Sequence, residues 1–200
     1  MHAQGWAERT IILVQPGNRR SMRPRLLRPG PADSKEWPAA RWAALLQQVH
    51  AHMPEALILL CGTPPERAML RSIQAATGEP TVAVATPGLR PLFALCQVAH
   101  SMISVDSGPA HAAAAVGLPV LVLFGKHWQR QWLPRSHSGS AVIGVGGPPT
   151  SRHLEEISVE TVFAAWRALL EQISASSALR ASISGGLDNR PQPTTSYVKS

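Results

Sequence analysis

The chain has 200 residues, of which 44% are hydrophobic, so it is long enough for one domain with a proper core. No apolar run approaches the roughly 18–20 residues of a membrane-spanning helix, and the first ten residues lack the apolar centre of a signal peptide. The 19 Lys and Arg residues outnumber the 12 Asp and Glu residues, which favours an anionic partner. We expect a cytoplasmic protein with one folded domain, residues 10–173, after a short extension, residues 1–9.

Short apolar strands and helices alternate along the chain. Residues 10–15 are predicted to form the first strand, and a loop rich in arginine and proline then runs from Pro16 to about Trp37. The further predictions, in chain order, are a helix over 39–52, a strand over 56–61, a helix from 64 or 65 to about 77, a strand over 81–85, a helix over 89–100, a strand over 101–105, an alanine-rich helix ending at Gly117, strands over 120–124 and 141–145, a helix over 159–173 and a disordered tail over 174–200.

The strands are continuous apolar runs, which is typical of strands that are covered on both faces. Their alternation with helices indicates an α/β fold, a Rossmann-like, doubly wound parallel sheet. In such sheets ligands bind beyond the carboxyl ends of the strands. Residues 15–18, 62–66, 86–88 and 106–111 would meet at that edge.

The segment Asp106-Ser107-Gly108-Pro109-Ala110-His111 lies between a buried strand and the alanine-rich helix. Ser107 or Gly108 can cap this helix, and Pro109 suits its first turn. The start of a helix presents free N–H groups and about half a positive charge. A phosphate or diphosphate therefore fits there, with His111 beside it.

This segment, with the AAAAVGLPVLVLFG that follows it, resembles the C-terminal half of glycosyltransferase family 9, the ADP-heptose:lipopolysaccharide heptosyltransferases. Two further matches occur in the family's order: Lys35-Glu36-Trp37-Pro38 followed by Arg41-Trp42, and Gly62-Thr63-Pro64-Pro65-Glu66. The resemblance covers about residues 10–170 and implies the C-terminal, donor-binding half of a GT-B glycosyltransferase. The sequence departs from the family at Gln15-Pro16-Gly17 and at Lys126-His127.

The resemblance implies an inverting, metal-independent transfer of a sugar from a nucleotide-diphosphate donor, ADP-heptose in this family, to a lipopolysaccharide-core or related glycan. The family's N-terminal domain binds the acceptor and supplies the catalytic base, and it has no counterpart in this sequence. The base is therefore not identified here, and a separate chain could carry that domain. The alternative is a truncated, catalytically inactive module that binds nucleotide sugars without the acceptor domain.

The resemblance assigns donor binding to eight residues: Gly17, Asn18, Lys35, Glu66, Asp106, Ser107, Gly108 and His111. Asp106 would accept a hydrogen bond from a sugar hydroxyl, whereas Ser107 and Gly108 would offer N–H groups, and Ser107 also its hydroxyl, to the diphosphate. Lys35 would offset charge on the leaving group. Glu66 would accept hydrogen bonds from the ribose hydroxyls.

Structural interpretations stand beside these roles. Asp106 could cap a helix, Lys35 could be a solvated cation, and Glu66 could stabilise the dipole of its own helix. A lone histidine such as His111 is often merely packed. Two further segments stay open in the same way: residues 86–88, expected to pass the nucleobase, and Arg130 with Trp132, expected in a loop that either shapes the donor pocket or packs it.

No metal and no cofactor are expected. The three aspartates, Asp33, Asp106 and Asp188, form no Asp-x-Asp pair that could hold a divalent ion on a diphosphate. Cys61 and Cys96 lie in apolar segments without metal-ligand spacing and are predicted to be buried free thiols.

An arginine cluster lies in the long loop, at positions 19, 20, 23, 25 and 28. It would suit an anionic glycan or lipid-linked acceptor, or a peripheral position at the inner membrane, or it is a solvated loop with no specific partner. No recognition motif accompanies the positive charge, so nucleic acid is not expected as a partner.

Overall fold

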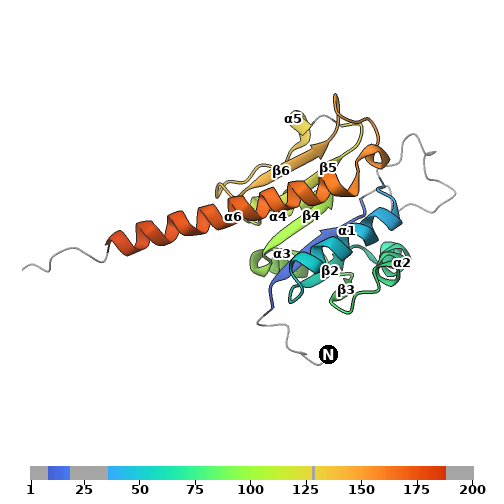
Figure 1. Ribbon diagram of the computed structural model, residues 1–200, viewed down its shortest axis with the longest axis horizontal. Coiled ribbons are helices and arrows are strands. Elements are labelled where there is room, and N and C mark those ends of the chain that lie inside the picture. The colour runs from blue at the N-terminus through green and yellow to red at the C-terminus, as the bar shows by residue number, and fades with distance from the viewer. Residues whose placement is uncertain (1–8, 19–35, 128, 188–200) are drawn as a thin grey trace, which may run out of the picture.

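The computed structural model describes residues 9–18, 36–127 and 129–187. Six strands form one sheet in the order β3-β2-β1-β4-β5-β6, and every neighbouring pair is parallel (Figure 1). The strands are β1 (Ile11–Gln15), β2 (Leu57–Cys61), β3 (Val82–Ala85), β4 (Ser101–Val105), β5 (Val120–Phe124) and β6 (Val142–Gly146). The prediction of a doubly wound parallel α/β sheet is confirmed.

The position of β1 at the centre of the sheet determines where a ligand can bind. The chain runs outward from β1 through β2 to β3, then returns to the other side of β1 to place β4. Gln15 lies opposite Ser104 in the β1–β4 register. The carboxyl ends of β1 and β4 therefore meet at the point where the strand order reverses, which is where open α/β sheets bind ligands.

Helices connect the strands as expected, with small differences at their ends. The α-helices are α1 (Ala39–His52), α2 (Arg67–Thr77), α3 (Leu89–Val98), α4 (Gly108–Ala115), α5 (Gln129–Trp132) and α6 (Val159–Leu187), and the 3₁₀ turns are η4 (Pro64–Glu66) and η5 (Leu154–Glu156). A loop was predicted where α5 stands, so that prediction is wrong.

The predicted end of the last helix at residue 173 is also wrong, because α6 continues to Leu187 and projects past the sheet (Figure 1). The extension lacks apolar periodicity but contains Ala and Leu, which favour helix. Its Ser174 and Ser176 hydroxyls donate to carbonyls one turn back, those of Leu170 and Gln172. The disordered tail predicted over 174–200 is therefore helical as far as 187, and 188–200 lie outside the described residues.

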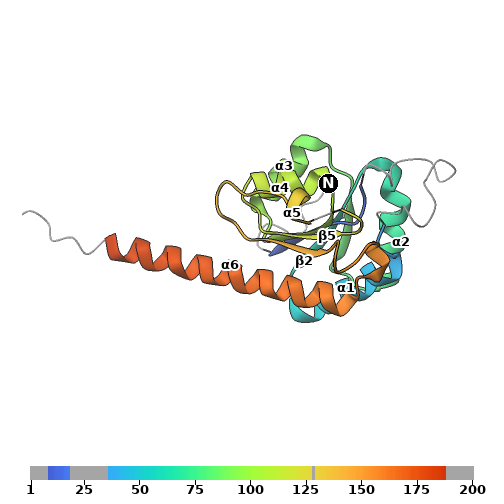
Figure 2. The ribbon, with the colours of Figure 1, turned by 90° about the horizontal axis from the view of Figure 1, so that it is seen from above.

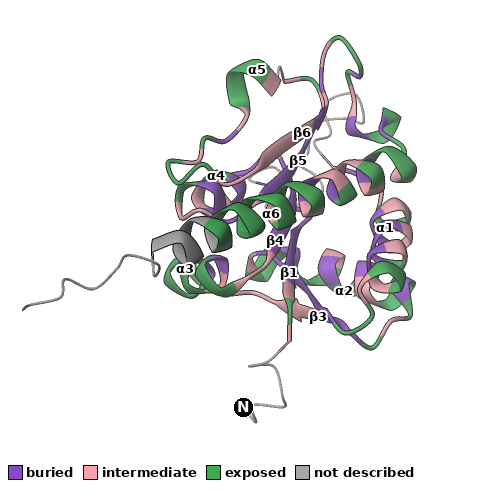
Figure 3. Ribbon diagram, turned by 60° about the vertical axis from the view of Figure 1, so that its left-hand side comes forward, coloured by how far each residue is buried: buried purple, intermediate pink, exposed green. Residues whose placement is uncertain are grey.

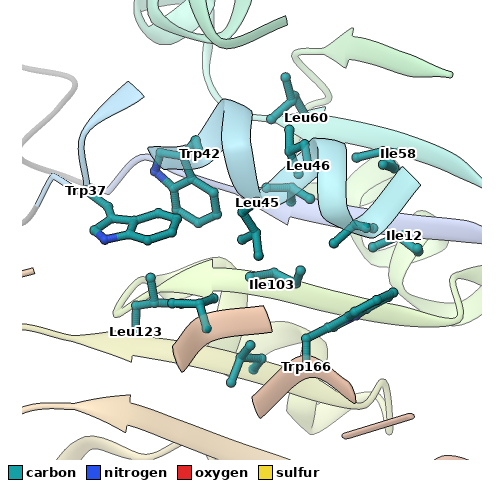
Figure 4. Packing of buried hydrophobic residues seen from close by; sticks show 14 of the residues in the cluster. Ile12, Trp37, Trp42, Leu45, Leu46, Ile58, Leu60, Ile103, Leu123 and Trp166 are labelled. Carbon is teal, nitrogen blue, oxygen red and sulfur yellow. The ribbon is translucent and has the colours of Figure 1, made fainter. Parts of the chain in front are cut away.

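Alternate residues of the buried strands supply two separate cores. One core lies between the sheet and α1, α2 and α6, where Trp42 and Trp166 pack on Ile12, Ile103 and Leu123 (Figure 4). The opposite face packs on α3 and α4, and Figure 2 shows these helices on the other side of the sheet from α1 and α6. In the middle of the sheet, β4 is buried along its length and β1 from Ile12 onward (Figure 3).

Alanine brings α4 close to the sheet. Ala110, Ala113 and Ala114 are fully buried against strand residues such as Met102 and Val122. Small side chains let a helix axis approach its strands closely, so the first turn of α4 sits directly above the end of β4. Among the helices of the described ranges, none is both long enough and apolar enough to span a membrane.

Candidate donor-binding site

The end of β1 forms one wall of the candidate site. Gln15, Gly17 and Asn18 are all buried there. The Gln15 side-chain amide donates a hydrogen bond to the Gly17 carbonyl at 3.1 Å. The loop after β1 is thereby fixed beside the end of β4, so the structure brings the predicted pair Gly17 and Asn18 to the same edge as Asp106–His111.

The turn from β4 into α4 forms the second wall. The Asp106 N–H donates to the Leu123 carbonyl at 3.1 Å, which anchors the turn to β5. Ser107 follows in extended conformation as the N-cap residue, and α4 begins at Gly108. The N–H groups of Ala110 and His111 donate to the Ser107 carbonyl at 3.2 and 3.5 Å.

The Ser107 side chain does not cap its helix. The Ser104 hydroxyl donates to the Val105 carbonyl at 2.7 Å, and Ser107 Oγ lies 3.0 Å from Ser104 Oγ. Because a serine hydroxyl carries one proton, Ser107 must be the donor in the second bond. The Ser107 hydroxyl proton, expected from the resemblance to face the diphosphate, is used within the protein here.

Among the residues that the structure describes, nothing covers the start of α4 at Gly108. Gly108 is exposed, and apart from its chain neighbours and its own helix backbone no described atom would lie within 4 Å of a Cβ atom built on it. His111 is exposed on the same turn, and Asp106 is half-buried. A negatively charged group could approach the α4 backbone closely at Gly108, where its N–H groups and the helix dipole are directed.

Glu66 is buried, 3% exposed, at the neighbouring turn after β2. Its Oε2 atom accepts hydrogen bonds from both the N–H and the hydroxyl of Thr63, each at 2.8 Å. A Cβ atom on Gly62 would lie 3.1 Å from the same oxygen and 2.9 Å from Leu70 Cδ1. The carboxylate therefore holds the β2–η4 turn together, whereas its assignment to the ribose stays a prediction.

Arg67 was not among the predicted residues, because a single arginine at a helix start carries no distinctive signal. Its guanidinium donates to the Thr86 hydroxyl at 2.7 Å and so connects the loops that follow β2 and β3. Thr86 and Pro87 are half-buried and Gly88 is exposed. The segment expected to pass the nucleobase thus lies at the same sheet edge, with an arginine beside it.

Lys35 and the five loop arginines lie outside the described residues. Trp37 and Arg41, which follow Lys35, make hydrogen bonds that the sequence did not indicate. The Trp37 indole N–H donates to the Ile157 carbonyl at 3.0 Å, and the Arg41 guanidinium donates to the same carbonyl at 2.7 Å and to that of Glu155. Trp37 and Arg41 thus join the start of α1 to the segment before α6.

The segment after β5 packs through Gln129, whose side-chain amide donates to the Gly146 carbonyl. No residue of α5 is buried. Trp132 is 48% exposed, with its ring centroid 6.1 Å from that of His127. Arg130 and Trp132 therefore do not pack the core, and their relation to a donor pocket stays a prediction.

The two thiols are buried and free, as predicted. Burial, with a smaller contribution from the neighbouring Cys96 thiol, raises the pKa of Cys61 to about 12, and burial raises the pKa of Cys96 to about 11. Both thiols are therefore protonated at neutral pH and are poor nucleophiles. Within the described ranges, no three His, Cys, Asp or Glu side chains are grouped so that they could hold a metal ion.

The chain is similar to heptosyltransferases in sequence and in fold. It is 34% identical over 106 residues to lipopolysaccharide heptosyltransferase 3 of Escherichia coli, a match that covers 52% of this chain and 31% of that protein. The structure of E. coli ADP-heptose lps heptosyltransferase II superposes with a TM-score of 0.64 at 24% identity, covering 83% of this chain and 48% of that one. An E. coli heptosyltransferase solved with ADP gives a TM-score of 0.61 at 20% identity, with 82% and 44% covered.

The chain thus spans from about a third to a half of the length of these relatives. A family model, described as glycosyltransferase family 9 (heptosyltransferase), matches residues 8–157. That range includes both walls of the candidate site and the β2–η4 turn. The chain therefore belongs to glycosyltransferase family 9, the heptosyltransferase family.

Proposed function

We propose that this chain is the nucleotide-sugar-binding part of a heptosyltransferase-like glycosyltransferase, and that the ends of β1 and β4 hold the donor diphosphate. The observation that carries the proposal is the open first turn of α4, directed at the point where the strand order reverses. Ligands of open α/β sheets bind at such points, and anions bind at helix starts. One solved relative is described as bound to ADP, which supports an adenine nucleotide as donor.

The proposed roles follow from the position of each group. The N–H groups of Ser107 and Gly108 would receive phosphoryl oxygens, and Asp106 would accept a hydroxyl of the donor sugar. Gly17 and Asn18 would line the opposite wall, His111 would lie beside the phosphates, and Lys35 would bring a cation to the leaving diphosphate. Fixed groups of this kind stabilise charge as it develops on a leaving group.

The proposed reaction is an inverting transfer from ADP-heptose to a lipopolysaccharide-core or related glycan. The acceptor hydroxyl attacks the anomeric carbon of the donor sugar while the bond from that carbon to the diphosphate oxygen breaks. The acceptor proton passes to a general base, and ADP leaves. We expect transfer to continue in the presence of EDTA, since the leaving charge is met by protein groups.

A second candidate is a module that binds the nucleotide sugar without transferring it. Both candidates require the same donor site but differ in turnover. In either case we propose a cytoplasmic location, with contact to an anionic glycan, a lipid-linked acceptor or the inner-membrane surface as the role of the basic loop. A chain carrying the acceptor-binding part is a further proposed partner.

Calorimetric titration with ADP, UDP, GDP and ADP-heptose tests the donor site. We expect ADP and ADP-heptose to bind, and a ligand at 100 times its Kd should raise the free energy of unfolding by about 2.7 kcal/mol. Asp106→Asn should weaken ADP-heptose more than ADP, whereas Glu160→Gln, an exposed change at the start of α6, should alter neither. If no sugar nucleotide binds, the proposal is refuted. If ADP is released when lipopolysaccharide core is added to the chain with ADP-heptose, the binding module is excluded.

A further inference from the structure

Ser104 is a fully buried residue of β4 to which no role in donor binding has been assigned. Its hydroxyl donates to the Val105 carbonyl at 2.7 Å and accepts the proton of Ser107, 3.0 Å away. These two bonds connect Ser107, the residue before α4, with the backbone of β4.

The connection matters because Ser107 is the N-cap residue of α4. A serine in that position usually accepts a hydrogen bond from the N–H of the second or third helical residue. The second residue here is Pro109, which has no N–H. The N–H of Ala110, the third residue, is therefore the group from which a Ser107 cap would accept a hydrogen bond. The Ser107 side chain makes no cap bond, and the Ala110 N–H makes a long bond, 3.2 Å, to the Ser107 carbonyl.

We propose that Ser104 is a positioning residue of the donor site, an inference that rests on the proposed function. By accepting the Ser107 proton, Ser104 holds that hydroxyl away from Ala110 and so keeps its oxygen out of the space in front of the Ser107 and Gly108 N–H groups, where the diphosphate would approach. Gln15, which lies opposite Ser104 in the sheet, acts similarly on the other wall by holding the Gly17 carbonyl at 3.1 Å. Ser104 and Gln15, the polar residues beneath the site, thus fix the Ser107 hydroxyl and the Gly17 carbonyl above them.

The test is a double-mutant cycle with the full chain and ADP. Ser104→Ala frees the Ser107 hydroxyl to turn toward the Ala110 N–H, and its oxygen would then occupy the space through which the phosphate approaches the Ser107 and Gly108 N–H groups. We expect ADP to bind about fivefold more weakly. In a Ser107→Ala background there is no hydroxyl to form the cap, so adding Ser104→Ala should leave the affinity unchanged. The free energy of unfolding should not fall in Ser104→Ala, because the new cap replaces the lost bond.

Ser101→Ala is the matched control. Ser101 is also fully buried on β4, and its hydroxyl is one of the described polar groups without a hydrogen-bond partner. It lies at the amino end of the strand, so its removal should leave ADP affinity unchanged. Hydrogen exchange of the Ala110 amide gives a readout that needs no ligand. Exchange should slow in Ser104→Ala, and it should keep the wild-type rate in Ser101→Ala.

Each other outcome overturns the inference in a recognisable way. Wild-type affinity in Ser104→Ala, or an equal loss with and without the Ser107 hydroxyl, shows that Ser104 does not act through Ser107. If the wild-type chain does not bind ADP, the proposed function fails first. Slower Ala110 exchange in Ser104→Ala would then show that Ser104 controls only the helix cap, and unchanged exchange would reject that control as well.

Discussion

Two turns at the same edge of the sheet are built in opposite ways. After β2, the Thr63 N–H and hydroxyl both donate to the buried Glu66 carboxylate, so the turn closes on itself. After β4, the N-cap residue Ser107 directs its hydroxyl to Ser104 and makes no side-chain cap bond to its own helix. The turn after β2 is thus held together by its own side chains, whereas the turn after β4 presents an open helix start.

The glycines of the two turns differ in the same way, since one is closely packed and the other is not. Gly62 is required by packing, because a Cβ atom would meet Leu70 and Glu66 at 2.9 and 3.1 Å. At Gly108 no atom of the described residues lies within 4 Å of the corresponding position, apart from its chain neighbours and its own helix backbone. The turn after β2 is thus packed against its own side chains, whereas the described residues leave room for a ligand at the turn after β4.

The largest expected effect comes from breaking the closed turn. Glu66→Ala removes two hydrogen bonds to a buried carboxylate and leaves Thr63 without its acceptor, so the free energy of unfolding should fall by about 2–4 kcal/mol. Urea unfolding followed by circular dichroism measures it. The exposed Glu156, which accepts from the Arg152 N–H in the same manner, is the control, and Glu156→Ala should destabilise far less. Equal losses would show that burial of Glu66 is not what matters.

Overpacking the closed turn should have the next largest effect. Gly62→Ala forces Leu70 or Glu66 to move, and we expect a loss of about 1–3 kcal/mol in the free energy of unfolding. Gly88→Ala provides the matched change, since the nearest atom to its Cβ would be Pro91 Cδ at 3.9 Å, an ordinary contact. Thermal unfolding of both variants checks the difference. A stable Gly62→Ala variant would contradict the packing of this turn.

Alkaline pH should weaken the strand that leads into the closed turn. Burial raises the pKa of Cys61 to about 12, whereas the unfolded thiol titrates near 9. Between these values the native state binds more protons than the unfolded state, so the free energy of unfolding decreases as pH rises above 9, by about 1 kcal/mol at pH 10. Denaturant titrations from pH 8 to pH 10 measure this decrease. It should be smaller in Cys61→Ala, and an identical slope would reject the assignment to this thiol.

The smallest effect on stability should come from the open turn. Gly108→Ala adds a methyl group that would clash with none of the described residues, and alanine favours helix, so the free energy of unfolding should stay the same or rise by about 0.5–1 kcal/mol. ADP should nevertheless bind at least about fivefold more weakly, because the methyl group occupies the approach to the α4 backbone. Calorimetry and thermal unfolding of one preparation give both values. If Gly108→Ala lowers the free energy of unfolding and leaves the affinity for ADP unchanged, then Gly108 serves the stability of the fold and not ligand access.

Much of this fold could be predicted from local patterns. The apolar runs over 101–105 and 120–124 match β4 and β5 residue for residue, because turn-forming Asp106–Pro109 and Gly117–Pro119 bound them. The predicted helix over 39–52 likewise matches α1. The strand order could not be predicted in this way, since it depends on pairings such as Gln15 with Ser104, which lie 89 positions apart by number.

The sequence predicted which segments meet at the candidate site, but not the hydrogen bonds that arrange them. The segment Asp106–His111 and the pair Gly17 and Asn18 do meet at one edge. The direction of the Ser107 hydroxyl could not be predicted, because it depends on the buried Ser104, which the sequence presents as one more residue of an apolar run. The link from Trp37 and Arg41 to Ile157 was missed for a related reason, since a carbonyl acceptor far along the chain leaves no signature in the sequence.

The central proposal is that the diphosphate binds at the open turn after β4. Titration of ¹⁵N-labelled chain with ADP, followed by amide chemical shifts, tests this directly. We predict the largest shifts at the N–H groups of Ser107 and Gly108, with smaller shifts at Gly17 and Asn18 and none at Ser101. Binding that leaves Ser107 and Gly108 unchanged, or no binding of ADP at all, would contradict it.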